Sequence, residues 1–184
     1  MLKGAEKTAD IDKALLSALL SFRCSQDADI ENFLKDKAID FEKRRFCRVF
    51  LLLNKESLEQ KILKIEAYFT LSMKSMKSDN TKVSNNKKKK IKGADPNTLQ
   101  FILIGQLGKY VEKKDNGYIR SEISGREILN AAFDVINSID KWLPCKAALI
   151  ECNDNPKVKK FYEDYGFSFL QKDNGHNQYT YINK

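Results

Sequence analysis

Hydrophobic residues recur along the chain with two periods, which predict alternating helices and strands. Spacings of three or four residues predict helices over residues 30–41, 124–143 and 155–166. Short apolar or alternating runs predict strands over residues 48–53, 64–73, 98–110, 147–152, 167–171 and 178–182. Residues 11–22 fit either a short amphipathic helix or an opening strand plus a turn, and residues 1–10 are expected to be a loose lead-in.

The order of these elements predicts the fold class. After the helix over residues 30–41 come two strands, and a strand–helix–strand–helix–strand series follows, which is typical of an α+β (or α/β) protein. We expect a single mixed, mostly antiparallel and twisted sheet with helices on both faces. The strands at 48–53 and 64–73 are expected to form a hairpin, and the whole chain, residues 1–184, is expected to be one domain.

The positive charge is concentrated in one segment. The chain carries a net charge of +8. Eight lysines and a single acidic residue, Asp79, lie between Lys74 and Lys92, so this segment accounts for +7 and the rest of the chain is nearly neutral. Residues 75–96 are also poor in apolar residues, which predicts a Lys-rich mobile loop within the domain. A lysine cluster such as Lys87–Lys90 is usually part of a solvated surface. The functional alternative is that it contacts the phosphates of RNA.

Composition excludes several classes of protein. The sequence has neither an apolar run of membrane-spanning length nor the pattern of a secretory signal, so we expect a soluble, cytoplasmic protein that does not bind membranes. The chain has one histidine and four cysteines without metal-ligand spacing, and therefore no metal is expected. We expect Cys24 and Cys152 to be buried thiols and His176 to be exposed.

Residues 155–167 carry the strongest local pattern. Asn155 can cap a helix, and Pro156 suits the first helical position. Gly166 is placed to end the helix in a left-handed conformation. The apolar stripe of this helix includes Tyr162. Taken alone, a tyrosine on such a stripe is more often part of a core than a catalytic group.

A second pattern precedes the helix that begins near Ser124. The strand over 98–110 ends at Leu107-Gly108-Lys109, where glycine suggests a bulge or a close approach of backbone. After a polar turn at residues 113–117, a loop leads into the helix start. Backbone N–H groups and the positive end of the helix dipole make such a start suitable for pyrophosphate. The candidate cofactor-binding residues are Leu107, Gly108, Lys109, Arg120, Ser121, Glu122, Ile123, Ser124, Gly125 and Arg126.

Together these motifs resemble the Gcn5-related N-acetyltransferase superfamily. Arg120 and Gly125 match the ends of its Arg/Gln-x-x-Gly-x-Gly/Ala pyrophosphate loop. Its later helix commonly reads Asn-x-x-Ala-x-x-aromatic/Leu-Tyr-x-x-x-Gly-Phe. The residues that match are Asn155, Phe161, Tyr162, Gly166 and Phe167, with Val158 where alanine is usual. Residues 22–24, 32–34 and 48–53 look like the N-terminal half of the toxin acetyltransferases that act on aminoacyl-tRNA. The resemblance spans roughly residues 21–169 and is more complete in the second motif than in the first.

The resemblance implies an acyl-CoA N-acyltransferase fold and acetyl-CoA as the cosubstrate. It implies that Tyr162 is the catalytic acid that protonates the leaving coenzyme A thiolate, and that Asn155 lies along the pantetheine arm. Backbone N–H groups near residues 107–109 are suited to hold the thioester oxygen. No general base is secure from the sequence: Glu112, Glu151 and a chain of water molecules remain alternatives.

Two departures from the family pattern affect the pyrophosphate loop. Ile123 stands where the first motif glycine is expected, so either its side chain crowds the phosphates or the loop takes another shape. The connection from Lys109 to Arg120 is also longer than the family pattern. Backbone N–H groups are what phosphate binding requires, so binding can survive both changes.

The sequence leaves the acceptor open. The leading hypothesis is transfer of an acetyl group from acetyl-CoA to a primary amine on a small molecule, a protein or a charged tRNA. The alternatives are toxin-like acetylation of aminoacyl-tRNA, in which Lys87–Lys90 contact the RNA, and a catalytically weak module that binds acyl-CoA or RNA. A homodimer is also left open.

Overall fold

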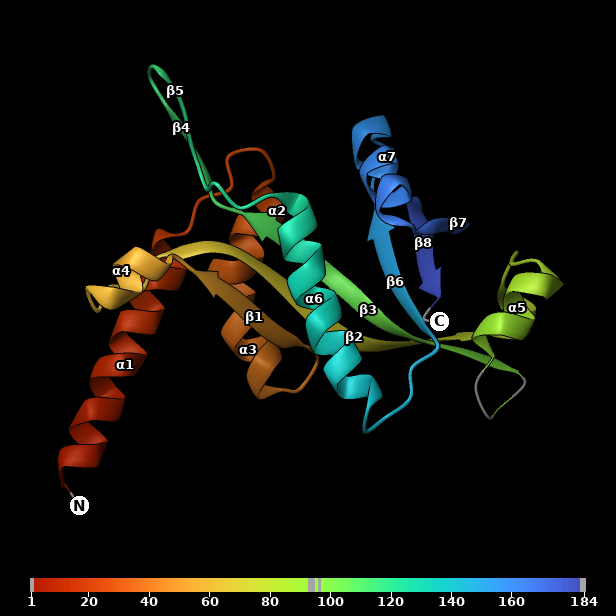
Figure 1. The fold of residues 1–184 in the computed structure, drawn as a ribbon, viewed down its shortest axis with the longest axis horizontal. Helices are drawn as coiled ribbons and strands as arrows, with labels where there is room; N and C mark the ends of the chain where they lie inside the picture. The colour runs from red at the N-terminus through yellow and green to blue at the C-terminus, as the bar shows by residue number, and fades with distance from the viewer. Residues whose placement is uncertain (1, 93–94, 96, 183–184) are drawn as a thin grey trace. The chain divides into compact units, whose positions relative to one another are not determined.

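The computed structural model describes residues 2–92, 95 and 97–182, which divide into two compact units. Unit 1 comprises residues 1–69 and 106–128, and unit 2 comprises residues 70–105 and 129–184. The boundaries between the units fall within strands β2 (Ile65–Lys77) and β3 (Thr98–Lys109) and within helix α6 (Gly125–Asp140), which Figure 1 labels. The organisation of the chain as one domain stays a prediction.

The described chain contains helices and strands in mixed order. The helical elements are α1 (Leu2–Ser21), α2 (Ala28–Asn32), the π-helix η1 (Phe33–Lys37), α3 (Ala38–Lys43), α4 (Lys55–Glu59), the 3-10 helix η2 (Ser78–Asn80), α5 (Asn85–Ile91), α6 (Gly125–Asp140) and α7 (Pro156–Tyr165). The strands are β1 (Arg48–Leu53), β2 (Ile65–Lys77), β3 (Thr98–Lys109), β4 (Val111–Lys114), β5 (Gly117–Arg120), β6 (Ala147–Cys152), β7 (Ser168–Asp173) and β8 (His176–Ile182). Within the described residues, no helix has the length and hydrophobicity needed to cross a membrane.

A six-stranded mixed sheet confirms the predicted fold class. Its strand order is β1-β2-β3-β6-β8-β7. β3 and β6 are parallel, whereas β8 pairs antiparallel with both β6 and β7. Because parallel neighbours need a crossover, α6 lies in the connection between β3 and β6. The pairing of β3 with β6 runs from Ile102–Ala148 to Ile104–Ile150 and ends one residue before Gly105.

Unit 1 has its own hydrophobic core. It is built around Tyr68 of β2, whose ring is fully buried and whose hydroxyl donates to the carbonyl of Ile30 (2.6 Å). The Phe22 ring meets Tyr68 edge-on with 5.5 Å between centroids, and the Phe33 ring stacks on it at 6.3 Å. The predicted neighbouring of β1 and β2 is confirmed. Phe50 stacks on Phe69 across these two strands, with 4.9 Å between the ring centroids.

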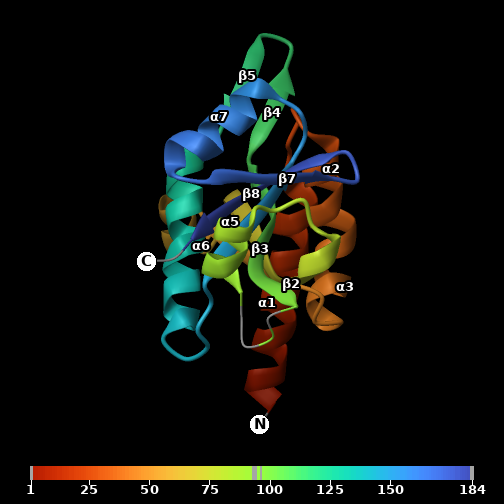
Figure 2. The ribbon, with the colours of Figure 1, turned by 90° about the vertical axis from the view of Figure 1, so that its right-hand side faces the viewer.

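Unit 2 has helices on opposite faces of its part of the sheet. Side chains alternate between the two faces of β6. Leu149 belongs to a buried cluster with Ile91 of α5, whereas Ala148 pairs with Tyr181, which contacts Phe133 of α6. Figure 2 shows α6 and α7 on the same side of β7 and β8. This side carries a continuous group of aromatic rings.

The predicted lead-in at residues 1–10 is wrong, because α1 already begins at Leu2. Of the two alternatives for residues 11–22, the helix is confirmed. Residues 2–10 are rich in Leu, Lys, Ala and Glu, which have high helix propensity. Adding turns to an existing helix is far easier than nucleating one, so the helix extends to the start of the described chain.

The segment 75–96 contains more regular structure than the predicted loop. β2 continues to Lys77, and α5 follows. Val83 and Ile91 are 5% and 1% exposed in the core cluster that also holds Leu99 and Leu149, so burial of two apolar side chains orders this lysine-rich stretch. Residues 93, 94 and 96 of the predicted loop lie outside the described residues. The mobility of the segment stays a prediction.

The connection from β3 to α6 contains an element that the sequence did not predict. β4 and β5 form a separate two-stranded sheet with Lys114 opposite Gly117, which makes the predicted polar turn the tip of a hairpin. Gly117 has a φ of 134°, a conformation that favours glycine at such a tip. Figure 1 shows this hairpin extending away from the helices of unit 1. The hairpin accounts for the length of the connection between Lys109 and Arg120.

Candidate active site

The end of β3 is shaped by a close approach to α2. A Cβ atom on Gly108 would lie 2.2 Å from Cγ2 of Ile30 and 3.1 Å from Cε1 of Tyr68. No larger residue fits without a shift of this packing, so the expected close approach at Gly108 is confirmed. Leu107 on one side of Gly108 is half-buried, and so is Lys109 on the other. The Lys109 ammonium donates to the carbonyl of Ile123 (3.0 Å), which ties β3 to the loop before α6.

The loop from Arg120 to Ser124 is held by hydrogen bonds around Ser121. The Ser121 amide donates to the carbonyl of Tyr110 (2.9 Å), and the residue is only 6% exposed. Its hydroxyl accepts from the Ile123 amide (3.2 Å). Ile123 is half-buried at the position of the first motif glycine, and its carbonyl accepts from Lys109. Whether its side chain crowds a phosphate stays a prediction.

α6 begins with a capping box, in which Ser124 and Glu127 satisfy each other's backbone amides. The Glu127 amide donates to the Ser124 hydroxyl (3.2 Å), and the Ser124 amide donates to the Glu127 carboxylate (2.7 Å). Hydrogen bonds from the Ser124 hydroxyl and amide, with a further contribution from Lys109, lower the pKa of Glu127. A negative charge therefore sits at this helix start. Glu127 was not among the residues predicted from the sequence, although Ser-x-x-Glu before an apolar run signals such a box.

The loop still offers donors and positive charge to an anion. The amides of Glu122 and Gly125 have no acceptor among the described residues, whereas those of Ile123 and Ser124 are already engaged. Lys109 is anchored beside them. The Arg120 guanidinium lies over the ring of Tyr118, 5.0 Å from its centroid, and both side chains are exposed. These residues fit a phosphate group, with fewer free amides than the sequence motif implies.

In unit 2, α7 has the predicted bounds and the predicted caps. The Asn155 side-chain oxygen accepts from the Lys157 amide (2.9 Å), and Pro156 is the first helical residue. Gly166 ends the helix in the left-handed conformation with φ 119°. A Cβ at Gly166 would lie 3.1 Å from Cε2 of Tyr181, so both backbone conformation and space require glycine. The role of Asn155 beside pantetheine stays a prediction.

Tyr162 presents a protonated, unpaired phenol. Its ring is half-buried and packs near Phe161 and Phe167, with centroid distances of 5.1 and 5.7 Å. Within the described part of unit 2, its hydroxyl has no hydrogen-bond partner. Burial raises the pKa of Tyr162 to about 12, and Cys152 adds to the rise when it is ionised. Burial also raises the pKa of Cys152, so both groups keep their protons at neutral pH.

Both carboxylates considered as general bases already accept hydrogen bonds. Glu112 accepts from the Tyr110 hydroxyl (2.8 Å) and from Lys114 (2.7 Å), and these bonds lower its pKa. Glu151 accepts from Lys74 (2.8 Å) and from the Gln178 amide (2.6 Å). Side-chain donors therefore occupy both carboxylates in this structure. The general base stays a prediction, with Glu112, Glu151 and a chain of water molecules as the alternatives.

The candidate residues thus fall into two groups. The structure brings Lys109 and Ile123 together in unit 1, where the other candidates of β3, the loop and the α6 start also lie. Asn155 and Tyr162 belong to α7 in unit 2. The expected burial of Cys24 and Cys152 and the exposure of His176 are confirmed. The binding and catalytic roles of the candidate residues stay predictions.

No protein-family model matches the sequence, and no curated protein matches it. Several solved structures, in contrast, are similar to this chain. A structure of AtaT complexed with acetyl-methionyl-tRNAfMet has a TM-score of 0.67 and 18% identity, over 89% of this chain and 86% of that one. A mutant of KacT, in which a tyrosine is replaced by phenylalanine, has a TM-score of 0.66 and 18% identity, over 88% and 85% of the two chains.

A structure of AtaTR bound with AcCoA is similar to the same degree. Its TM-score is 0.66 at 19% identity, and the match covers 89% of this chain and 86% of that chain. Other matching structures are described as AtaT mutant toxins, one of them bound to the C-terminus of the antitoxin AtaR. The strand order of the six-stranded sheet, the parallel β3–β6 pair and the similarity to these structures all indicate the same fold. The chain therefore has the Gcn5-related N-acetyltransferase fold, in the form found in the AtaT and KacT structures.

Proposed function

We propose that the protein is an acetyl-CoA-dependent N-acetyltransferase that acts on a primary amine. The observation that carries the proposal is the phenol of Tyr162, which is half-buried, unpaired within its unit and protonated at neutral pH. It stands on a helix with the Asn cap and Gly stop of the family motif. The similarity in fold to AtaTR, which was solved with AcCoA, supports acetyl-CoA as the cosubstrate.

The proposed reaction needs one acid and an open route for one proton. The neutral amine attacks the thioester carbonyl, and the carbon–sulfur bond breaks as the amide forms. The Tyr162 hydroxyl gives its proton to the departing sulfur, and the amine proton leaves through water. Tyr162 is then reprotonated from solvent. Because a pKa of about 12 lies above that of an ordinary thiol, the phenol gives its proton to sulfur in a step closely coupled to breaking of the carbon–sulfur bond.

The amides of Glu122 and Gly125, with Lys109, are the groups we propose for the pyrophosphate. They combine free backbone donors, the positive end of α6 and an anchored ammonium group. The ionised Glu127 opposes an anion at the same helix start. We therefore expect weaker acetyl-CoA binding than in an enzyme whose loop keeps both motif glycines.

The acceptor that we favour is the amino group of a charged tRNA. Lys89 and Lys90 of α5 are exposed, and Lys87 and Lys88 lie in the same helix. This charge suits an RNA backbone. AtaT, which has the same fold, was solved with acetyl-methionyl-tRNAfMet. A module that binds acyl-CoA or RNA without turnover is the alternative, favoured by the occupied amides of Ile123 and Ser124.

The test is release of free thiol from acetyl-CoA, measured with a chromogenic disulfide, in the presence of small amines, peptides or aminoacyl-tRNA. The proposal predicts acceptor-dependent release by the native chain and its loss in Tyr162→Phe. Tyr118→Phe, which changes an exposed tyrosine, should retain activity. A rise in melting temperature with acetyl-CoA but no release with any acceptor would instead support the binding module.

A further inference from the structure

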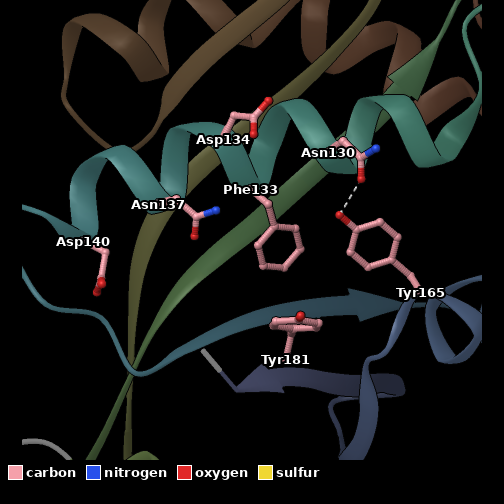
Figure 3. Close-up of a pocket in the computed structure, with 7 residues that line it drawn as sticks. All are labelled: Asn130, Phe133, Asp134, Asn137, Asp140, Tyr165 and Tyr181. Carbon is pink, nitrogen blue, oxygen red and sulfur yellow. Dashed lines mark hydrogen bonds between the residues drawn. The ribbon is translucent and has the colours of Figure 1, made fainter. Parts of the chain in front are cut away.

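Unit 2 contains a hollow that is separate from the phenol of Tyr162. It has a volume of about 530 Å³ and lies between α6, α7 and β8 (Figure 3). Phe133, Tyr165 and Tyr181 supply aromatic rings, and four polar residues of α6 complete the lining: Asn130, Asp134, Asn137 and Asp140. Among the residues that the structure describes, no lysine or arginine lines it.

The aromatic side of the hollow is rigidly packed. The Phe133 ring lies 4.7 Å from that of Tyr181 and stacks on that of Tyr165 at 5.5 Å, measured between centroids. The Tyr165 hydroxyl donates to the side-chain oxygen of Asn130 (2.8 Å), which fixes its ring, as Figure 3 shows. The Tyr181 hydroxyl has no partner among the described residues. The hollow thus offers fixed ring faces and an available hydroxyl.

The helical side of the hollow is polar and negative. Asp134, Asn137 and Asp140 are exposed and recur every three residues of α6. Figure 3 shows Asn137 and Asp140 on the same side of α6 as the Phe133 ring. One oxygen of Asp140 accepts from the Cys145 amide (2.7 Å), whereas the Asp134 carboxylate has no partner among the described residues. Such carboxylates attract a cation and repel an anion.

An apolar surface continues from this hollow along the same helix. A second hollow, of about 450 Å³, shares Asp134 with the first and is also lined by Val135, Ile139 and Trp142. Trp142 is 88% exposed and Leu143 is 61% exposed, which is unusual for large apolar side chains. The two hollows together present an acidic, aromatic face next to an apolar one.

We propose that this face of α6 binds a basic segment of a partner protein. An arginine side chain would stack on the aromatic rings and pair with the Asp140 carboxylate, because a planar guanidinium suits both contacts. Asp134, on the other side of α6 in Figure 3, adds negative charge where the first hollow meets the second. An apolar residue next to it would cover Trp142 and Ile139. RNA and acyl-CoA are excluded from this face by the charge of Asp134 and Asp140. The proposal is independent of the acetyl-transfer chemistry.

The test uses the only tryptophan of the chain, Trp142, as the reporter. A synthetic peptide with alternating arginine and leucine is titrated against the full chain, with an otherwise identical glutamate peptide as a second probe. We expect saturable change in Trp142 fluorescence with the arginine peptide only. The double variant Asp134→Asn/Asp140→Asn, which keeps the acceptor for the Cys145 amide, should weaken binding at least tenfold.

The matched control is Asp115→Asn/Asp173→Asn, which removes the same charge from an exposed turn residue and from the exposed last residue of β7. It should bind like the native chain, and unchanged melting temperatures would show that both double variants fold. Equal weakening in both double variants would overturn the proposal, because general charge would then explain binding. Equal binding of the two peptides would also overturn the proposal. A fluorescence change with a single-stranded RNA oligonucleotide that is no larger in Asp134→Asn/Asp140→Asn than in the native chain would do the same, because the two carboxylates would then not repel RNA.

Discussion

Glu127 accepts two hydrogen bonds from Ser124, one from the amide at 2.7 Å and one from the hydroxyl at 2.6 Å. This pair closes the start of α6 and occupies a backbone amide that the family motif offers to a phosphate. The same pair therefore stabilises the helix and leaves one amide fewer for the proposed anion site. The two effects can be separated by substitution.

Ser124→Ala should lower stability by about 1 kcal/mol through loss of the helix cap. For a chain of this size, that corresponds to a fall in Tm of about 2–4 °C. Ser138→Ala is the matched control on the same helix, because the Ser138 hydroxyl only donates back to the carbonyl of Asp134. Thermal unfolding of both variants measures the difference, and an equal fall in Tm would contradict the assigned role of the cap.

Glu127→Gln should tighten acetyl-CoA binding by about two- to fivefold at low salt, since it removes a negative charge from the helix start. The glutamine can still accept from Ser124, so the cap is retained. Calorimetric titration with acetyl-CoA measures the effect. The gain should shrink at high salt, where exposed charges are screened. Unchanged affinity at low salt would place the pyrophosphate elsewhere.

The pKa of Tyr162 predicts a wide alkaline plateau. The phenol acts in its protonated form, which predominates below its pKa of about 12. Raising the pH from 7 to 10 should therefore leave its contribution to kcat intact, and activity that depends on it is lost only as pH approaches 12. Tyr162→Phe should lower kcat by about 10²- to 10⁴-fold. Thiol release measured across pH tests this; a fall in kcat centred near pH 9 and absent from Tyr162→Phe would be inconsistent with it.

Gly108→Ala should destabilise the protein by about 1–3 kcal/mol, because the new methyl group overlaps Ile30 in a packed core. Gly105→Ala on the same strand should cost less, since its Cβ would meet the Thr70 hydroxyl at 3.0 Å and Cδ2 of Leu103 at 4.0 Å, with no overlap as short as that at Gly108. Urea unfolding compares the two. Combining Gly108→Ala with Ile30→Ala should recover part of the loss that Gly108→Ala causes, and no recovery would argue against the overlap as its cause.

Two lysines of α5 should stabilise the fold, and the other two should contact RNA. Lys88 donates to the carbonyl of Ser78 (2.6 Å), and Lys87 donates to that of Phe169, so alanine at either position should lower Tm. Lys89 and Lys90 are exposed. Replacing both by alanine should leave Tm unchanged but reduce the slope of log affinity for single-stranded RNA against log salt by about 1.4. An unchanged slope would remove these two lysines from the RNA contact.

The elements best predicted from the sequence are those with local signals at their ends. The bounds of α7 follow from Asn155, Pro156 and Gly166, each of which favours one conformation at its own position. The runs 101–104 of β3 and 147–150 of β6 were predicted as strands because they are continuously apolar, as expected where both faces are covered. These signals need no knowledge of distant residues.

The features that escaped prediction depend on distant contacts or on weak local signals. α5 is ordered by burial of Ile91 in a cluster with Leu99 and Leu149, which the lysine-rich sequence obscures. In the candidate site, spacing located the loop before α6 but did not reveal that Lys109 reaches the carbonyl of Ile123. That contact joins residues from two different elements. The free or engaged state of each amide likewise became visible only in three dimensions.

The β4–β5 hairpin makes the chain open to cleavage and insertion at a defined point. Its tip has open space around Gly117, and the adjacent Lys113 and Lys114 are exposed. Exposed tips of this kind are preferred sites of proteolytic nicking and tolerate inserted residues. Limited trypsin digestion should cut here, between β3 and the loop of Ser121. A fluorescent tag inserted between Asp115 and Asn116 would give a labelled protein whose two cores are left intact.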